Sequence, residues 1–157
     1  MNYMKIKNYD IANGDGVRTS LFVSGCDLHC RGCFNKESWE LNAGQFFSRK
    51  VKKELLKNLE PDYIKGLSLL GGDPFNPNNV KDIAFLVEDT KRLFPDKTIW
   101  AWSGYTLDEL LERKDQYTKK ILDNIDVLVD GQFIEEEKDL SLRFRGSRNQ
   151  RLIYFAK

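Results

Sequence analysis

The cysteines of this chain, Cys26, Cys30 and Cys33, fall within one eight-residue stretch that reads Cys-Asp-Leu-His-Cys-Arg-Gly-Cys. Three thiolates on a short loop can hold three irons of a four-iron cluster and leave the fourth iron without a protein ligand. Proteins that only transfer electrons normally supply four cysteines to such a cluster. The spacing therefore predicts a 4Fe-4S cluster whose fourth iron is free to bind a substrate.

Other uses of these cysteines are weaker. A disulfide framework is disfavoured because the number of cysteines is odd and residues 1–11 lack the apolar stretch of a secretory signal. A zinc site with His29 as fourth ligand stays open, although His29 directly precedes Cys30 and adjacent side chains rarely face one tetrahedral metal. Inert buried thiols fit poorly with the polar neighbours Asp27 and Arg31.

Composition predicts one globular domain over residues 1–157, with 41% hydrophobic and 31% charged residues. No apolar run approaches the roughly 18 residues that would span a bilayer. The net charge of +1 gives no overall field that would attract nucleic acid or an anionic membrane. Because the thiols are unpaired and no export signal is seen, we expect a cytoplasmic protein without nucleic-acid or membrane partners.

The apolar patterns alternate between short strand-like runs and longer amphipathic ones. Strands are predicted at residues 19–24, 66–70, 98–102 and 125–129, with a weaker one at 152–155. Helices are predicted at residues 48–59, 78–94 and 107–123. This alternation is typical of an α/β fold with a parallel sheet. Since a closed eightfold barrel needs about 250 residues, we expect an incomplete, open (β/α) barrel of about five to six strands.

Polar or glycine-rich motifs follow four of the predicted strands. Carboxyl ends of parallel strands carry the active site in such folds, so the motifs are expected to meet at one edge. By itself the Gly-Gly-Asp-Pro turn would be an ordinary β-to-α connection. Beside the cysteine loop, its backbone groups and carboxylate could receive the polar end of a ligand. The motifs are the cysteine loop, Gly71-Gly72-Asp73-Pro74, Ser103-Gly104-Tyr105 and Asp130-Gly131-Gln132.

Together, Cys-x3-Cys-x2-Cys and Gly-Gly-Asp-Pro resemble the motifs of radical S-adenosylmethionine enzymes. Within that superfamily the chain is similar to the activating proteins of anaerobic ribonucleoside-triphosphate reductases, over residues 2–151. The further matching segments are Asn13-Gly14-Asp15-Gly16-Val17-Arg18, Gly32-Cys33-Phe34-Asn35-Lys36, Trp102-Ser103-Gly104-Tyr105, Val129-Asp130-Gly131 and Arg145-Gly146-Ser147-x-Asn149-Gln150.

The resemblance implies an oxidoreductase that cleaves S-adenosylmethionine reductively and generates a glycyl radical on its protein substrate, the reductase. An external electron donor such as flavodoxin would reduce the cluster. No catalytic side chain is implied beyond the ligands of the cluster and the cofactor. The implied cluster ligands are Cys26, Cys30 and Cys33. The implied contacts to S-adenosylmethionine are Gly32, Cys33, Phe34, Gly71, Gly72 and Asp73.

The chain departs from the family pattern at Asp15, where proline is usual, and at Phe34, where tyrosine is frequent. Two alternative functions stay open: activation of another glycyl-radical enzyme such as pyruvate formate-lyase, and a zinc-binding interaction module. The sequence also leaves open the role of His29, the electron donor and the oligomeric state, a homodimer included. Four arginines near the end could bind cofactor, partner or solvent: Arg143, Arg145, Arg148 and Arg151.

Overall fold

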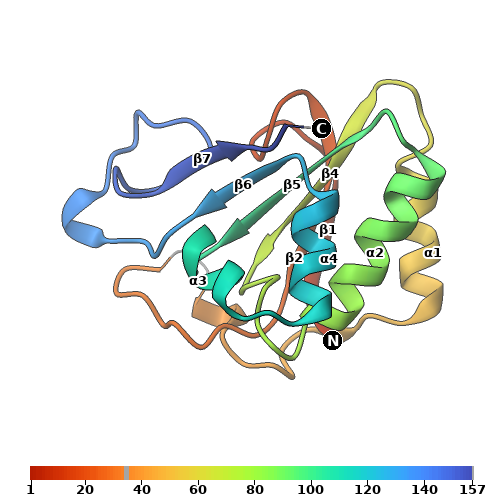
Figure 1. Cartoon of the computed structure of the whole chain (residues 1–157). Helices are drawn as coiled ribbons and strands as arrows, with labels where there is room; N and C mark the ends of the chain where they lie inside the picture. The colour runs from red at the N-terminus through yellow and green to blue at the C-terminus, as the bar shows by residue number, and fades with distance from the viewer. Residues whose placement is uncertain (34–35, 157) are drawn as a thin grey trace.

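The computed structural model describes residues 1–33 and 36–156. Within these residues, seven strands form one open sheet in the order β3-β1-β2-β4-β5-β6-β7 (Figure 1). The strands are β1 (Asn2–Asp10), β2 (Val17–Val23), β3 (Gln45–Phe46), β4 (Ile64–Gly71), β5 (Thr98–Ser103), β6 (Val127–Asp130) and β7 (Arg151–Tyr154). The helices are α1 (Arg49–Asn58), α2 (Val80–Leu93), α3 (Leu107–Glu112) and α4 (Gln116–Asn124), with short 3-10 helices η1 (Lys36–Ser38) and η2 (Glu135–Glu137).

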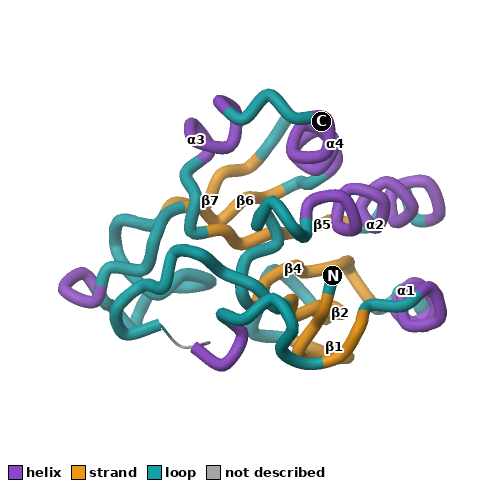
Figure 2. Tube along the Cα trace, turned by 90° about the horizontal axis from the view of Figure 1, so that it is seen from below, coloured by secondary structure: helices purple, strands orange, loops and turns teal. Residues whose placement is uncertain are grey.

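The centre of the sheet is parallel and its borders are antiparallel. Strands β2, β4, β5 and β6 run in the same direction. Strand β1 is antiparallel to both β2 and β3, and β7 is antiparallel to β6. The α-helices lie along one face of the sheet, and the long loops lie on the other (Figure 2). The carboxyl ends of the parallel strands therefore share one edge.

Two apolar clusters fix the sheet between its layers. Along β5, Ile99 and Ala101 belong to the main core, which is built with the helices, whereas Trp100 belongs to a smaller cluster. Successive side chains of a strand point to opposite faces, so this alternation assigns each cluster to one face. The smaller cluster includes Val127 and Val129 of β6, and its far side is covered by the segment between β6 and β7.

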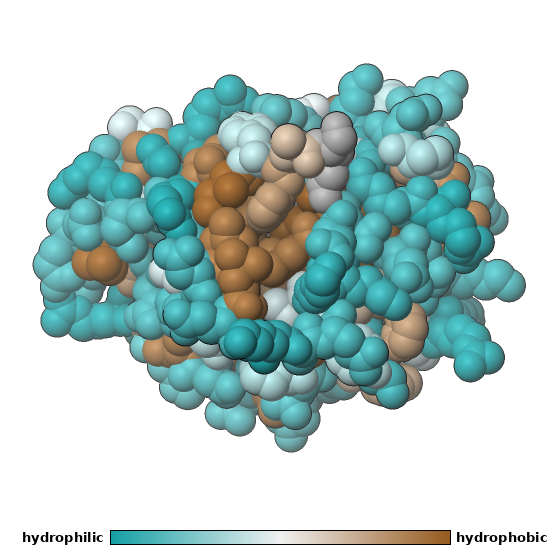
Figure 3. All heavy atoms as spheres, in the orientation of Figure 1, coloured by the Kyte–Doolittle hydropathy of each residue, from teal (hydrophilic) through white to brown (hydrophobic). Residues whose placement is uncertain are grey.

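The surface is mostly polar in the orientation of Figure 1, but an apolar patch lies over β6 between α3 and α4 (Figure 3). Leu107, Ile153 and Phe155 are only partly buried where they pack against the main core. Among residues 1–33 and 36–156, no helix is both long enough and apolar enough to cross a membrane.

The predicted strands coincide with β2, β4, β5, β6 and β7, and the sheet is open as expected. The count of five to six strands was too low, because β1 and β3 were not predicted. Strand β1 alternates weakly and exposes several polar side chains, and β3 has only two residues. The single helix predicted at 107–123 is two helices, since Lys114 has φ 57° and Asp115 caps α4 by accepting from the Thr118 N–H.

Candidate functional site

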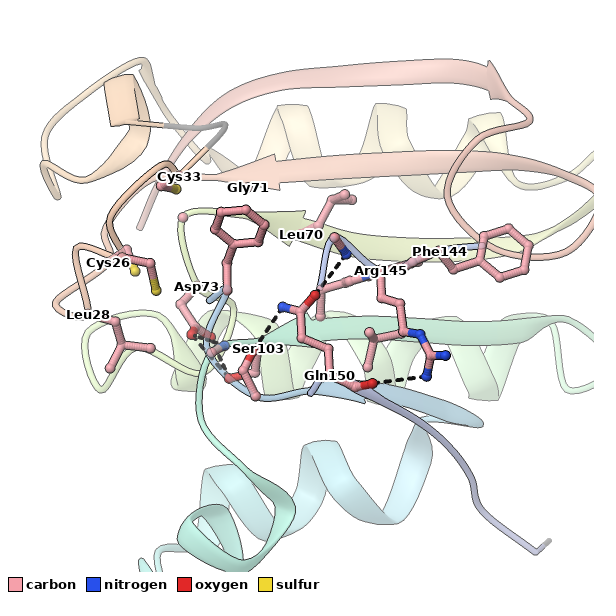
Figure 4. Close-up of a pocket in the computed structure, with 18 of the residues that line it drawn as sticks. Cys26, Leu28, Cys33, Leu70, Gly71, Asp73, Ser103, Phe144, Arg145 and Gln150 are labelled. Atoms are coloured by element: carbon pink, nitrogen blue, oxygen red, sulfur yellow. Dashed lines mark hydrogen bonds between the residues drawn. The ribbon is translucent and has the colours of Figure 1, made fainter. Parts of the chain in front are cut away.

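A cavity of about 380 Å³ lies at the carboxyl ends of the parallel strands (Figure 4). All four motifs that were expected to meet at this edge contribute to its wall, with the cysteines after β2 and Gly131 after β6. The remaining lining side chains are largely apolar. They include Leu28, Leu70, Trp102, Phe133 and Phe144.

The cysteine loop is held close to the end of β2. The Gly25 N–H donates to the Ser38 carbonyl at 2.6 Å, and the Cys26 N–H donates to the Trp39 carbonyl at 3.0 Å. The Cys33 N–H donates to the Cys30 carbonyl at 3.1 Å, which closes a turn between these two residues. The backbone therefore returns all three thiols to the same cavity wall.

Two of the three thiols, those of Cys26 and Cys30, are stabilised in the protonated form. Burial raises the pKa of Cys26, although backbone N–H groups of Leu28 and His29 act in the opposite direction. Burial also raises the pKa of Cys30, and here the opposing hydrogen bond comes from the backbone N–H of Phe133. Since thiolates are the ligands of iron, loading the site must release protons.

The donor set fits a polynuclear iron–sulfur group better than a single ion. Within the described part of the chain, no group of three or more His, Cys, Asp and Glu side chains is gathered closely enough to hold one metal ion. His29 has φ 46° and stacks flat on Trp39, with ring centroids 4.2 Å apart. Three soft thiols spread along one cavity wall suit a cluster whose irons each take a different cysteine.

Gly71 and Gly72 are required by the protein's own backbone. Gly71 has φ 110°, and a Cβ there would lie 2.5 Å from the Val23 nitrogen. A Cβ on Gly72 would lie 2.6 Å from the Gly25 carbonyl oxygen. The end of β4 thus packs directly against the chain that leads into Cys26, so any contact with a ligand is additional to a structural role.

Asp73 connects the ends of β2, β4 and β5. Its N–H donates to the Gly25 carbonyl at 2.8 Å. Its carboxylate accepts from the Phe75 N–H at 2.9 Å, the Gly104 N–H at 2.9 Å and the Ser103 hydroxyl at 3.0 Å. The side chain is 1% exposed, and burial raises its pKa to about 6 against these hydrogen bonds. The carboxylate therefore shapes the cavity wall, and as an anion it would favour a cationic ligand group nearby.

The turn after β5 is fixed by helix α3 as well. Thr106 and Glu109 form a capping box, in which the Thr106 hydroxyl accepts from the Glu109 N–H at 3.2 Å. The Leu107 N–H donates to the Asp130 carboxylate at 2.7 Å, which links this turn to the end of β6. Two segments predicted from sequence, 103–105 and 130–132, are thereby joined through α3.

The four arginines near the end of the chain have different environments. Arg151 donates to the Asp130 carboxylate at 2.9 Å and so ties β7 to β6. Arg145 lines the cavity and donates to the Gln150 carbonyl at 2.9 Å. Arg143 and Arg148 are exposed on the same segment. The structure therefore separates one strand-pairing arginine, one cavity arginine and two surface arginines.

Most of the predicted cofactor contacts lie at the cavity. Cys33, Gly71, Gly72 and Asp73 line it. Gly32 belongs to the same loop and packs against Phe133 and Glu135, and Phe34 lies outside the described residues.

Sequence reasoning missed part of the cavity wall, namely Leu28, Phe133 and Phe144. Gln150 had appeared only within a matching segment. Its side chain accepts from the Gly146 and Ser147 N–H groups and donates to the Gly131 carbonyl, which shapes the loop that covers the cavity.

Comparisons with known proteins agree with this site. Residues 12–153 match the family model of a 4Fe-4S single cluster domain. This match and the three-thiol cavity define an iron–sulfur protein. The chain is 46% identical over 152 residues to the anaerobic ribonucleoside-triphosphate reductase-activating protein of Haemophilus influenzae, covering 96% of each chain.

Two more relatives carry the same name. The protein of Escherichia coli (strain K12) is 47% identical over 152 residues, covering 96% of each chain. The protein of Enterobacteria phage T4 is 42% identical over 154 residues, covering 97% of this chain and 93% of the relative. The chain belongs to the family of anaerobic ribonucleoside-triphosphate reductase-activating proteins, which confirms the resemblance seen in the motifs.

Proposed function

We propose that this protein activates an anaerobic ribonucleoside-triphosphate reductase as a radical S-adenosylmethionine oxidoreductase. One observation carries the proposal: three thiols and the Gly-Gly-Asp turn line the same cavity, in a chain 46% identical to a protein named for that activation. Cys26, Cys30 and Cys33 would bind three irons of a 4Fe-4S cluster, and the fourth iron would be left for S-adenosylmethionine.

When bound, the cluster and the cofactor supply one-electron cleavage of a carbon–sulfur bond and removal of a hydrogen atom from a glycine of the reductase. The protein's own groups orient the cofactor and enclose the reacting atoms. Gly71, Gly72 and Asp73 would receive the amino end of the cofactor, and the backbone near Gly32, Cys33 and Phe34 would lie beside it. The buried Asp73 carboxylate favours the positively charged groups of that ligand. Leu28, Trp102 and Phe144 would keep water from the reacting atoms.

The fold and the partners follow from the same proposal. The four parallel strands, with helices on one face only, support an incomplete barrel of the radical S-adenosylmethionine type. The reductase would present its glycine at the rim where the cavity lies, and an electron donor such as flavodoxin would reduce the cluster. We place this reaction in the cytoplasm, where free thiols persist.

The test is anaerobic reconstitution followed by three measurements. We expect about four irons per chain, formation of 5′-deoxyadenosine from S-adenosylmethionine with dithionite, and a glycyl-radical signal on an anaerobic ribonucleoside-triphosphate reductase. Pyruvate formate-lyase in place of the reductase should give no such signal. A signal only on pyruvate formate-lyase would favour that alternative, and stoichiometric zinc without iron uptake would overturn the proposal.

Cys30→Ala is the matched control, because two thiolates cannot retain the cluster that three hold. The variant should lose the intact cluster and form 5′-deoxyadenosine only at background level. Its free energy of unfolding without metal should change by no more than about 1 kcal/mol, since Cys30 is only half-buried. Full activity in this variant would show that Cys30 is not a ligand.

A further inference from the structure

The segment that follows β6 lies directly against the cysteine loop. Gly32 has φ 76°, and a Cβ there would meet both the Phe133 ring and the Glu135 side chain at 3.2 Å. Phe133 lines the same cavity as Cys30 and Cys33. The two segments are about one hundred residues apart in sequence, and a charged interaction links them.

Arg31 provides that interaction. Its Nε donates to the Glu135 carboxylate at 2.9 Å, and its terminal nitrogen also contacts the Glu136 carboxylate. One planar guanidinium therefore binds two consecutive residues of η2, an arrangement that a lysine ammonium cannot reproduce with the same geometry. Arg31 lies between Cys30 and Cys33, so these ion pairs act on the ligand loop itself.

The contribution of these ion pairs to global stability is small. The Arg31 side chain is 76% exposed, and Glu135 and Glu136 are 48% and 66% exposed. Exposed pairs of this kind are strongly screened by water. Their effect is instead local, because Glu135 lies only two residues after Phe133.

Phe133 lies beside Cys30 in the cavity wall, and a hydrogen bond from its backbone N–H lowers the pKa of the Cys30 thiol against the effect of burial. Hydrogen bonds to ligand sulfurs stabilise the more negative, reduced form of an iron–sulfur cluster and so raise its reduction potential. Groups that hold such donors tune a metal site without touching the metal. The position of this N–H depends on where the segment from Phe133 to Glu136 lies.

We propose that the ion pairs of Arg31 with Glu135 and Glu136 position the Phe133 N–H on the Cys30 sulfur and thereby raise the reduction potential of the cluster. Arg31 is thus a positioning residue for electron entry. The inference rests on the proposed function, because it requires a cluster bound to Cys30.

Arg31→Lys tests the geometry at constant charge. The variant should load iron as wild type does, and its cluster should have a more negative midpoint potential in an anaerobic redox titration. Arg31→Lys should also speed hydrogen exchange of the Phe133 amide in the metal-free chain. An unchanged potential in a fully loaded variant, or unchanged amide exchange, would overturn the inference.

A pair of glutamate variants separates positioning from simple charge. Removing negative charge near a cluster favours its reduced form, so Glu137→Gln on the same 3-10 helix should shift the potential slightly upward. Glu135→Gln with Glu136→Gln removes more negative charge but also releases the segment, and we expect a downward shift. An upward shift in the double variant would overturn the inference, because it would show that the change of charge, and not the position of the segment, sets the reduction potential. Failure of the wild-type chain to take up iron would instead refute the proposed function.

Discussion

Two arginines, one near the start of β2 and one in the cysteine loop that follows β2, make different kinds of contact. Arg18, near the start of β2, is fully buried, whereas Arg31 in the cysteine loop is 76% exposed. Arg18 donates to the Ser68 hydroxyl at 2.8 Å, the Thr98 hydroxyl at 2.9 Å and the Thr98 carbonyl at 2.8 Å. Arg31 instead pairs with exposed glutamates, and water competes with them for its guanidinium group.

The Arg18 network extends to the wall of the cavity. The Ser68 hydroxyl donates to the carbonyl of Asn13, and Asn13 lines the cavity. Burial lowers the pKa of Arg18 to about 10, which still leaves it charged at neutral pH. We call the buried Arg18 network the floor of the cavity, and the exposed segments around the cavity that carry Arg31, Arg143 and Arg148 its rim. We expect the rim to have the lower local stability, as functional segments often do.

The largest effect is expected at the floor. Arg18→Met should lower the free energy of unfolding by about 3–5 kcal/mol, because it leaves buried hydroxyl and carbonyl acceptors without their donor. Urea denaturation of the metal-free chain measures this loss. Arg31→Met is the rim control, and it should cost less than about 1 kcal/mol. Equal losses in the two variants would refute the contrast between the floor and the rim.

Asp73 should make stability depend on pH. Its pKa rises from 3.8 to about 6 on folding, so the folded chain binds this proton more tightly than the unfolded chain. Stability from this group is therefore present below pH 3.8 and is lost as pH rises to about 6, an effect on the order of 2–3 kcal/mol.

Comparing unfolding of the metal-free wild type and Asp73→Asn at about pH 4 and pH 7 checks the sign, since the asparagine variant should lack this fall. Asp123→Asn, at an exposed position on α4, should retain it. If wild type and Asp73→Asn show the same pH dependence, Asp73 does not ionise with the raised pKa.

A smaller effect is expected where the floor meets the rim. The added Cβ in Gly72→Ala would collide with the Gly25 backbone. To relieve this collision the loop before Cys26 should move, which should lower the free energy of unfolding by about 1–3 kcal/mol. Iron uptake should fall in parallel. Gly104→Ala is the matched control, because its Cβ meets the flexible end of the Leu28 side chain, which can rotate away. Normal iron uptake by Gly72→Ala would show that the loop tolerates the collision.

Much of this fold could be predicted because the central strands are buried on both faces. Strands β4, β5 and β6 are nearly continuous apolar runs, which stand out from the amphipathic helices. Strand β1 has one exposed face with charged residues and a bulge between Lys7 and Asp10, so its pattern is irregular. The break at Lys114 depends on a left-handed backbone conformation that the apolar spacing did not indicate.

The site was predictable where the chemistry is local in sequence. The cysteine spacing and the Gly-Gly-Asp turn could be read directly. The engagement of Asp73 by Ser103 could not, because it depends on how β4 and β5 pair in register. The same holds for Phe133 beside Cys30, which becomes visible only when the segment after β6 folds back on the loop.

The smallest effect is expected on the outer rim, at the two surface arginines. Arg143 lies 3.8 Å from Asp15, with both side chains largely exposed, so this weak pair leaves it available to an acidic partner surface. Arg143→Glu with Arg148→Glu should weaken binding to the reductase several-fold and slow glycyl-radical formation, as rim charges mainly affect association. Formation of 5′-deoxyadenosine without the reductase should stay unchanged, since neither side chain lines the described cavity.

Arg92→Glu with Lys119→Glu makes the same charge change on the helical face and should leave binding unaltered. Raising the salt concentration should weaken the wild-type complex more than that of the Arg143 and Arg148 double variant. Calorimetric titration with the reductase measures these affinities, and equal affinity for wild type and both double variants would remove the docking role of the two arginines.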